Sequence, residues 1–344
     1  TFNVVIQFES CFGRRCFPLF CRRPKCGQPI SDPYLMELEG LLQDYQTDGC
    51  IFPVKGLISA ERLDEIDALL SKLVADRPQV EKGDEKNLAP EDLLNLHLTC
   101  KEVLELCREP QVLRLVAQIL GTEDLSVFTS RILCKEPGTG KEIVWHQDSN
   151  YWPLTAPGNV TPSAQLTPDD VAPQVTSLWL ALDPVTEENG AMEVLSFRSQ
   201  PESCRNLPKE FILDSGGSTN GFDNFNLSLD ESKLNVTKRR RVCIQRGEAE
   251  FHSAYTIHRS DPNRSASRRM AWIVRYCATG TRVVPGVRGS FDEGYRLVPV
   301  MGRGTTPVEE VQGFCSVAEK EEDGRALRSI YRPCFGNAVK ELKK

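Results

Sequence analysis

Apolar residues recur with a helical period through the first third of the chain. Leucines three and four residues apart form one stripe after Pro33, and a second stripe of leucine, isoleucine and valine follows Ser59. Between the two stripes, the short apolar run "CIFPVKGLI" predicts a strand. A helical layer is therefore predicted over residues 31–120, with helices at about 31–48, 59–77, 90–107 and 110–120, the last closed by Gly121.

Beyond Gly121 the pattern changes to short apolar strands separated by turn residues. The strands are predicted in "SVFTSRILCK", "VTSLWLAL", "AMEVLSF", "RRVCIQRGEAEFHSAYTIH" and "MAWIVRYCATG". Turn signals at this spacing are typical of an antiparallel sandwich or barrel. Two long polar segments, 155–174 and 200–237, interrupt the strands, and loops of that length are either lids and binding loops or plain disorder. We predict one domain over residues 31–300, with its β core at 121–300.

The two ends of the chain differ in composition from this domain. Residues 1–30 hold five basic residues against the single acid Glu9, and their four cysteines recur at every fifth position, at Cys11, Cys16, Cys21 and Cys26. Structural zinc sites usually space cysteines two to four residues apart, so a zinc site is the weaker interpretation. A basic leader that is disordered or related to targeting is the stronger one. Residues 301–344 are predicted to form a C-terminal extension.

The composition of the chain indicates which kinds of partner it binds and in which cellular compartment it is found. With 42 basic and 48 acidic residues the formal charge is −6, so no strongly basic surface indicates nucleic acid or anionic lipid. No apolar run reaches the roughly 20 residues that a membrane helix needs. The 13 cysteines, an odd number in a long chain without a signal-peptide core, indicate reduced thiols. We expect an intracellular, cytoplasmic protein, or an organellar one if the leader directs it, that acts on a small molecule; its oligomeric state stays open.

The stretch "IVWHQD" places two metal-capable side chains two residues apart. If it enters or ends a strand, His146 and Asp148 lie on one face, because side chains alternate along a strand. A metal needs a further ligand, and the remaining histidines are His97, His252 and His258. The last of these is followed by a turn-rich segment and by a strand that opens with two arginines. Two histidines and one carboxylate are the ligand set of non-haem Fe(II) oxygenases, and an arginine could hold the far end of a dicarboxylic co-substrate.

Four motifs then occur in order: "WHQDSNYWPL", "LWLALDPVTEENGAMEV", "GEAEFHS" and "IHRSDPNRSASRR". From about residue 48 to 280 the chain resembles the phytanoyl-CoA dioxygenase family of Fe(II)- and 2-oxoglutarate-dependent oxygenases. The resemblance implies a mainly β fold with flanking helices, a double-stranded β-helix of the jelly-roll or cupin-like kind. It also implies that His146, Asp148 and His258 are the iron ligands and the catalytic residues.

The resemblance further assigns residues to 2-oxoglutarate. Arg269, eleven residues past the distal histidine, matches the family's co-substrate arginine. Ser260, Gln147 and Trp179 match positions that also contact the co-substrate. Ideal alternation turns Gln147 away from the metal, so its contact requires the chain to leave strand geometry there.

Two other arginines could take the place of Arg269, and two stretches of the sequence differ from the family's usual motifs. Arg268 is the nearest rival of Arg269, and Arg275 would share the face of Arg269 in an unbroken strand. The family's usual "PGSH" reads Ser196-Phe197-Arg198-Ser199 here, which bears on substrate handling. The basic residue that some members place before the sheet has no counterpart near residues 93–97, which bears on co-substrate binding.

The other two histidines are interpreted as structural. A strand period puts His252 on the face of His258, but a continuous strand would separate them by about 20 Å at roughly 3.3 Å per residue, so both could not bind one ion. We interpret His252 as a packing residue or one that supports a ligand. His97 lies in a leucine-rich helix, where a hydrogen-bonded core histidine is expected. Burial in the core is likewise expected for Tyr151, Trp152, Cys134 and Cys277.

The resemblance implies a dioxygenase that uses Fe(II), 2-oxoglutarate and O2, with ascorbate as a further candidate cofactor. Its usual reaction is hydroxylation with release of succinate and CO2. Halogenating relatives replace the position of Asp148 with a small residue, so halogenation is not expected. Two alternatives stay open: a jelly-roll enzyme that uses Zn²⁺ or Mn²⁺ as a Lewis acid, and a family member that has lost turnover. The substrate itself is not given by the sequence.

Overall fold

The computed structural model describes residues 33–75, 92–138, 140, 142–152, 154–156, 174–200, 207, 211–214, 227–283, 296–305 and 307–308. The predicted leader at 1–30, most of the predicted loop at 155–174 and most of the C-terminal extension lie outside these residues. Contacts divide the chain into two units, residues 1–41 and 42–344. The described part of the first unit is helical and begins α1 (Pro33–Asp48). None of the described helices is long and apolar enough to cross a membrane.

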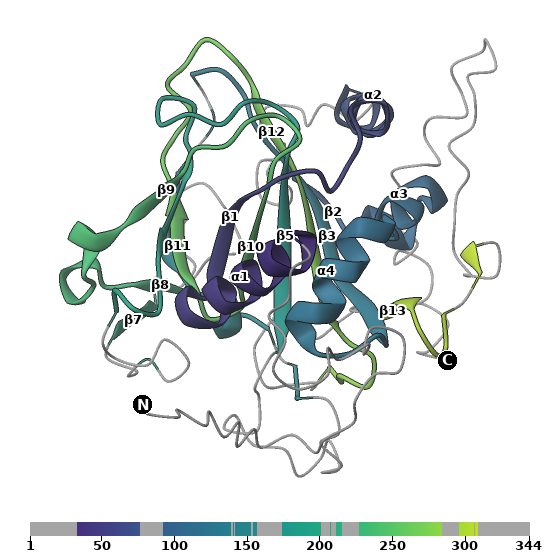
Figure 1. The fold of residues 1–344 in the computed structure, drawn as a ribbon. Helices are drawn as coiled ribbons and strands as arrows, with labels where there is room; N and C mark the ends of the chain where they lie inside the picture. The colour runs from purple at the N-terminus through teal and green to yellow at the C-terminus, as the bar shows by residue number, and fades with distance from the viewer. Residues whose placement is uncertain are drawn as a thin grey trace, which may run out of the picture. The chain divides into compact units, whose positions relative to one another are not determined.

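The larger sheet of the second unit has seven antiparallel strands. Its path is β1 (Cys50–Val54), β10 (Ala249–Ser253), β5 (Val175–Ala181), β12 (Arg269–Ala278), β3 (Leu125–Lys135) and β13 (Val298–Met301), with β2 (Asp92–Leu94) also paired to β3. Strand β5 is buried along its whole length and β12 along most of it, which fits their nearly unbroken apolar sequence. These strands form the wall on which much of the site is built (Figure 1).

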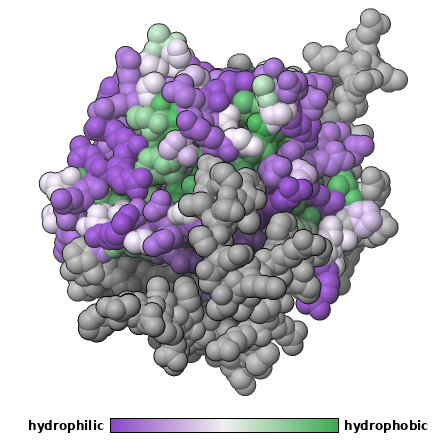
Figure 2. Space-filling view, in the orientation of Figure 1, coloured by the Kyte–Doolittle hydropathy of each residue, from purple (hydrophilic) through white to green (hydrophobic). Residues whose placement is uncertain are grey.

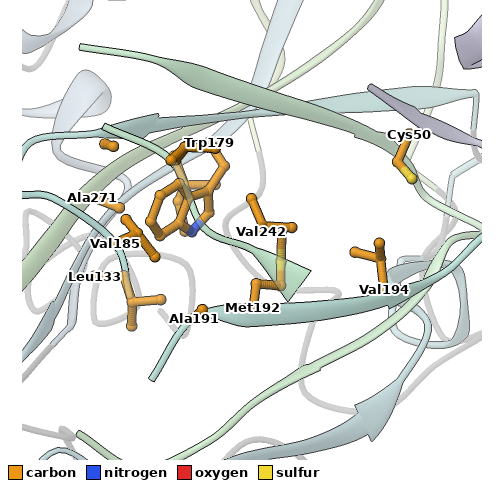
Figure 3. Close-up of a cluster of buried hydrophobic side chains, with 12 residues drawn as sticks. Cys50, Leu133, Trp179, Val185, Ala191, Met192, Val194, Val242 and Ala271 are labelled. Carbon is orange, nitrogen blue, oxygen red and sulfur yellow. The ribbon is translucent and has the colours of Figure 1, made fainter. Parts of the chain in front are cut away.

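A smaller sheet of four strands completes the β core. Its order is β4 (Ile143–His146), β11 (Ile257–Ser260), β6 (Met192–Leu195) and β9 (Arg240–Val242). An apolar cluster joins the two sheets, because Leu133, Trp179 and Ala271 come from the larger sheet while Met192 and Val242 come from the smaller one (Figure 3). Two antiparallel sheets joined by one core are the arrangement of the predicted double-stranded β-helix.

The helices follow the predicted stripes in part. Helix α2 (Ala60–Ala75) buries the five apolar residues that the sequence places on one face, Leu63, Ile66, Leu70, Leu73 and Val74. Helix α4 (Pro110–Leu120) ends at Gly121, whose φ of 68° is the left-handed conformation favoured at helix ends. It packs on strands β5 and β12, which supports the larger sheet from outside (Figure 1).

The helix predicted over residues 90–107 is wrong for residues 92–98 and confirmed for Lys101–Leu106. Its first part forms β2, where Leu94 pairs with Arg131 of β3, and a short 3₁₀ turn follows at Leu96–Leu98. Only α3 (Lys101–Leu106) is helical. Pairing with an available sheet edge outweighs the helical preference of this leucine-rich stretch. Because β1 and β2 both join the larger sheet, residues 31–120 are not a purely helical layer.

The described residues of the segment 200–237 contain secondary structure that the sequence did not predict. Strands β7 (Ile212–Asp214) and β8 (Leu227–Leu229) pair antiparallel, and two 3₁₀ turns follow at Glu231–Lys233 and Val236–Lys238. Leu229 and Leu234 join a buried cluster with Trp145 of β4, so this segment covers part of the smaller sheet.

Hydrophilic residues cover most of the described surface visible in Figure 2, with smaller apolar areas between them. Among the described residues, the large hydrophobic side chains classed as exposed are Leu94 and Leu213, at 45% and 48%. Most of the other large apolar side chains are buried in the core. The candidate functional residues are polar side chains that are buried among them.

Candidate metal centre and co-substrate cavity

Three predicted ligands meet at one point between the strands. His146 is the last residue of β4, and His258 of β11 is its direct partner in the antiparallel register. Asp148 begins a 3₁₀ turn, η2 (Asp148–Asn150), immediately after β4. One ligand atom from each of the three residues lies within 4.8 Å of the others, and all three side chains are buried. The sequence prediction of the ligand set therefore agrees with the geometry.

The backbone fixes the orientation of both imidazoles. Nδ1 of His146 lies 2.8 Å from the carbonyl oxygen of Val144, and Nδ1 of His258 lies 2.9 Å from that of Thr256. A carbonyl only accepts, so each Nδ1 carries the hydrogen and each Nε2 keeps its lone pair. Burial lowers the pKa of both rings, in His258 well below the ordinary value. Both are thus neutral imidazoles prepared to bind a cation.

Asp148 is held as a carboxylate. Burial alone raises its pKa, but the Arg275 guanidinium and the His252 ring hold that pKa well below the usual range. The Arg275 Nε lies 3.5 Å from Asp148 Oδ2, and His252 Nε2 lies 3.7 Å from the same oxygen. Two neutral imidazoles and one carboxylate on one side of a cavity fit a divalent metal that keeps open positions, the arrangement typical of non-haem Fe(II).

Arg269 lies in the same cavity as the two ligand histidines. Its side chain is fully buried, and Nη2 donates to the Gly190 carbonyl at 3.0 Å. Its Nε and Nη1 have no hydrogen-bond partner among the described residues. The guanidinium carbon also lies 5.3 Å from the ring centroid of Trp179, which shares the cavity wall. A buried guanidinium with two unused donors is a site prepared for a carboxylate.

The rival arginines have other roles. Arg268 points the opposite way and makes a two-pronged ion pair with Asp183, at 3.0 and 3.1 Å. Arg275 does line the cavity with Arg269, as the predicted shared face requires, but it contacts the metal-ligating carboxylate. Of the neighbouring pair, Arg269 is therefore the arginine that faces the cavity.

Ser260 lies beside Arg269 with a partner that the sequence did not reveal. Lys135, fully buried at the end of β3, donates from Nζ to the Ser260 hydroxyl oxygen at 2.8 Å. The Ser260 hydroxyl thereby accepts from Lys135 and keeps its own hydrogen for a ligand in the cavity. In the sequence, the one signal for Lys135 was a lysine at the end of an apolar strand. In the structure, this lysine is the register partner of Arg269.

Two other predicted co-substrate residues differ in their placement. Trp179 lines the cavity, as expected. Gln147 is buried, and its amide nitrogen donates to the Tyr255 carbonyl at 2.6 Å. It is not among the described residues that line the cavity, in agreement with the strand alternation that turns it from the metal.

The predicted distance between His252 and His258 is wrong. Their ring centroids lie 4.7 Å apart, because the chain leaves the larger sheet after β10, turns at residues 254–256 and enters the smaller sheet as β11. The expectation of about 20 Å assumed one continuous strand. His252 contacts the ligand Asp148, and its ring also lines the cavity.

The remaining candidates are structural. His97 is buried with Nδ1 2.8 Å from the Ser130 hydroxyl, which confirms the hydrogen-bonded core histidine. Cys134 and Cys277 are buried thiols, and Tyr151 and Trp152 pack in one apolar cluster.

The residues that replace the expected "PGSH" secure the backbone. Arg198 makes a two-pronged ion pair with Asp48 at 2.6 and 2.7 Å. The Phe197 backbone N–H donates to the carbonyl of the same Asp48 at 3.0 Å. This stretch therefore fastens the end of β6 to the end of α1.

Sequence comparison finds relatives that match part of the chain. Over 213 residues the chain is 27% identical to a probable alpha-ketoglutarate-dependent hypophosphite dioxygenase of Stutzerimonas stutzeri, covering 61% of this chain and 64% of that protein. It is 24% identical over 156 residues to a phytanoyl-CoA dioxygenase domain-containing protein 1 homolog of Caenorhabditis elegans, covering 45% and 47%. The match spans less than two thirds of the length of each relative.

Structure comparison supports the same fold. The crystal structure of the epimerase SnoN in complex with Fe3+, alpha ketoglutarate and nogalamycin RO is similar with a TM-score of 0.55 at 19% identity, covering 78% of this chain and 97% of that one. Across residues 45–271 the sequence matches the family Phytanoyl-CoA dioxygenase (PhyH). The motifs, the double-stranded β-helix and this match over most of the β core establish that the chain belongs to the phytanoyl-CoA dioxygenase family.

Proposed function

We propose that this protein is a non-haem Fe(II)- and 2-oxoglutarate-dependent dioxygenase that hydroxylates a small molecule. One observation carries the proposal. The neutral Nε2 atoms of His146 and His258 and the carboxylate of Asp148 converge beside a cavity whose wall holds the buried, partly unpartnered guanidinium of Arg269. A metal site and an acid-binding site in one cavity fit a co-substrate that is a keto acid at one end and a carboxylate at the other.

Each residue has a definite task in this proposal. His146, Asp148 and His258 would hold the iron, and Arg269 with the Ser260 hydroxyl would bind the far carboxylate of 2-oxoglutarate. Bound Fe(II) supplies the oxidative chemistry, in which O2 and 2-oxoglutarate yield succinate and CO2 while one oxygen atom enters the substrate. The apolar wall of Leu133, Ile273 and Met192 would exclude water from the reacting groups.

The charge of the cavity supports an acidic co-substrate. Four arginines line it, Arg131, Arg259, Arg269 and Arg275, and no aspartate or glutamate does so among the described lining residues. Arg259 is engaged by Glu193 at 2.7 Å and Asp261 at 3.2 Å. The low dielectric of a buried site strengthens the attraction of the Arg269 guanidinium for a diacid.

Hydroxylation is the outcome we propose for the substrate. Asp148 occupies the carboxylate position, which leaves no space for a halide ligand there. The relatives carry names for different reactions and substrates, including hypophosphite oxidation and epimerisation of a natural product. The identity of the substrate is therefore a matter for screening: a metabolite panel tested for faster 2-oxoglutarate turnover should return one class of compound above the others.

The test of the proposal is spectroscopic and chemical. Anaerobic addition of Fe(II) and then 2-oxoglutarate should produce a visible metal-to-ligand charge-transfer band, and admission of O2 should release succinate. Absence of both the band and succinate would reject the proposal. A Lewis-acid enzyme would instead retain Zn²⁺ or Mn²⁺ and consume no O2, and would leave the unused donors of Arg269 without a purpose. A family member without turnover would bind metal tightly and release no succinate.

A further inference from the structure

Two buried charged residues of β10 adjoin the metal centre without being metal ligands. Glu250 is fully buried and His252 is 3% exposed. Their side chains share the inner face of the larger sheet, and His252 Nδ1 lies 2.8 Å from Glu250 Oε2. Glu250 occupies a position where an apolar residue would be usual. Its register partner on the adjacent strand β5 is Trp179. A buried carboxylate on an apolar wall is costly unless a specific partner compensates for it.

The two oxygens of Asp148 face different neighbours. Its Oδ1 lies 3.8 Å from His146 Nε2, on the ligand side. Its Oδ2 lies 3.7 Å from His252 Nε2 and 3.5 Å from Arg275 Nε. Asp148 Oδ2, His252 Nε2 and Arg275 Nε have no hydrogen-bond partner among the described residues. Both nitrogens are therefore available to the one oxygen that lies near them.

We propose that Glu250 and His252 are positioning residues for the metal-ligating carboxylate. Glu250 fixes the ring of His252, and His252 together with Arg275 holds Asp148 Oδ2 so that Oδ1 is presented to the metal. This inference rests on the proposed metal centre but not on 2-oxoglutarate turnover. It gives the site a row of buried polar side chains, from Glu250 through His252 to Asp148.

The inference requires a hydrogen on Nε2 of His252. A lone pair there would face the negative oxygen of Asp148. The hydrogen is present if His252 is an imidazolium between two carboxylates, and also if a protonated Glu250 donates to Nδ1. In either state His252 donates toward Asp148.

Isosteric variants test the role of each member. Glu250→Gln removes the charge and keeps the shape, and His252→Gln keeps a donor toward Asp148 but loses the ring held by Glu250. We expect each variant to bind Fe(II) about ten- to a hundredfold more weakly, the effect typical of residues that orient metal ligands. The visible bands of the Co(II)-substituted variants should also shift, because the carboxylate no longer keeps one coordination geometry.

The matched control is Glu248→Gln, two residues before Glu250 in the chain. Glu248 pairs with the exposed Lys55 at 3.4 Å and lies outside the cavity wall. This variant should keep wild-type Fe(II) affinity and Co(II) spectrum. Wild-type affinity and spectrum in both Glu250→Gln and His252→Gln would overturn the inference.

A measurement on the unaltered protein decides the matter if a variant fails to fold. Nitrogen-15 labelling of the four histidines and NMR of the Zn²⁺-loaded full chain should show a hydrogen on Nε2 of His252. A metal-bound Nε2, or one that carries no hydrogen, would overturn the inference. Failure of the proposed function is distinguishable, since a protein that releases no succinate can still show this metal-binding and NMR behaviour.

Discussion

His146 on β4 and His258 on β11 are paired residues of adjacent antiparallel strands, and their ring centroids lie 4.1 Å apart. The sheet register therefore sets the distance between two metal ligands. A slip of one residue would turn one imidazole to the opposite face and dismantle the site.

Removal of one ligand should abolish the charge-transfer band. In His258→Ala the pair loses one nitrogen donor, so we expect no Fe(II)–2-oxoglutarate band at concentrations that saturate the wild type. The control is His97→Asn, a buried histidine held by Ser130 outside the cavity, which should keep the band. Anaerobic absorption titration measures both, and a band of wild-type intensity in His258→Ala would contradict the ligand assignment.

Replacement of the acid-binding arginine should weaken the binding of the co-substrate and leave the binding of the metal unchanged. Arg269→Lys keeps a charge but loses the two unused donors, Nε and Nη1, and a hydrogen bond to a charged group contributes roughly 1.5–3 kcal/mol. We expect KM for 2-oxoglutarate to rise roughly 10- to 150-fold with Fe(II) affinity unchanged. Arg268→Lys, whose partner is Asp183, should alter this KM little. Equal effects of the two variants would refute the assignment.

Gly190 should be intolerant of a side chain. Its φ is +85°, and an added Cβ would collide with the backbone carbonyl of Asp261. The Gly190 carbonyl also receives the hydrogen bond of Arg269. We expect Gly190→Ala to lower the free energy of unfolding by about 2 kcal/mol or more and to raise KM for 2-oxoglutarate.

Gly121→Ala is the matched control for this substitution. Gly121 also has a positive φ, of 68°, but open space around the position of a Cβ. Gly121→Ala should lower the free energy of unfolding by only about 1 kcal/mol, the cost of a left-handed backbone at alanine, and should leave KM unchanged. Urea unfolding and initial rates measure the pair, and similar losses in both variants would speak against the collision.

Acid should destabilise the metal-free protein partly through His97. Burial lowers the pKa of His97 to about 3, whereas the unfolded ring titrates near 6.5. Between these values the unfolded chain binds a proton that the folded chain does not, so stability falls as pH falls. We expect this residue to contribute up to about 1.4 kcal/mol per pH unit below pH ~6. Urea unfolding of wild type and His97→Asn from pH 7 to 5 measures it; parallel curves would exclude the contribution.

The metal ligands and the arginine could be predicted because the chain carries, in order, the motifs of a known family. Strand alternation separates Arg268 from Arg269, and the structure turns one to Asp183 and the other to the cavity. Resemblance to the phytanoyl-CoA dioxygenase family identified His146, Asp148 and His258, which the register of β4 and β11 then brings together.

What the sequence missed depends on contacts between distant segments. The closeness of His252 to Asp148 arises from a crossing between sheets within a few residues, which an alternating pattern does not reveal. Lys135 becomes a partner of Ser260 only through the pairing of β3 with β12, and β2 forms only because an edge of β3 accepts it. Such pairings are set by the whole sheet rather than by local preference.

The two ends of the proposed co-substrate would be held by opposite walls. The imidazoles that would hold the metal, and through it the keto acid, belong to the smaller sheet, whereas Arg269 belongs to the larger one. Facing sheets pack about 10 Å apart, and the bulk of the side chains between them sets that gap. The distance between the two sheets thus selects the length of the co-substrate. A diacid with one methylene fewer or more than the five-carbon 2-oxoglutarate would contact one wall without reaching the proper position at the other.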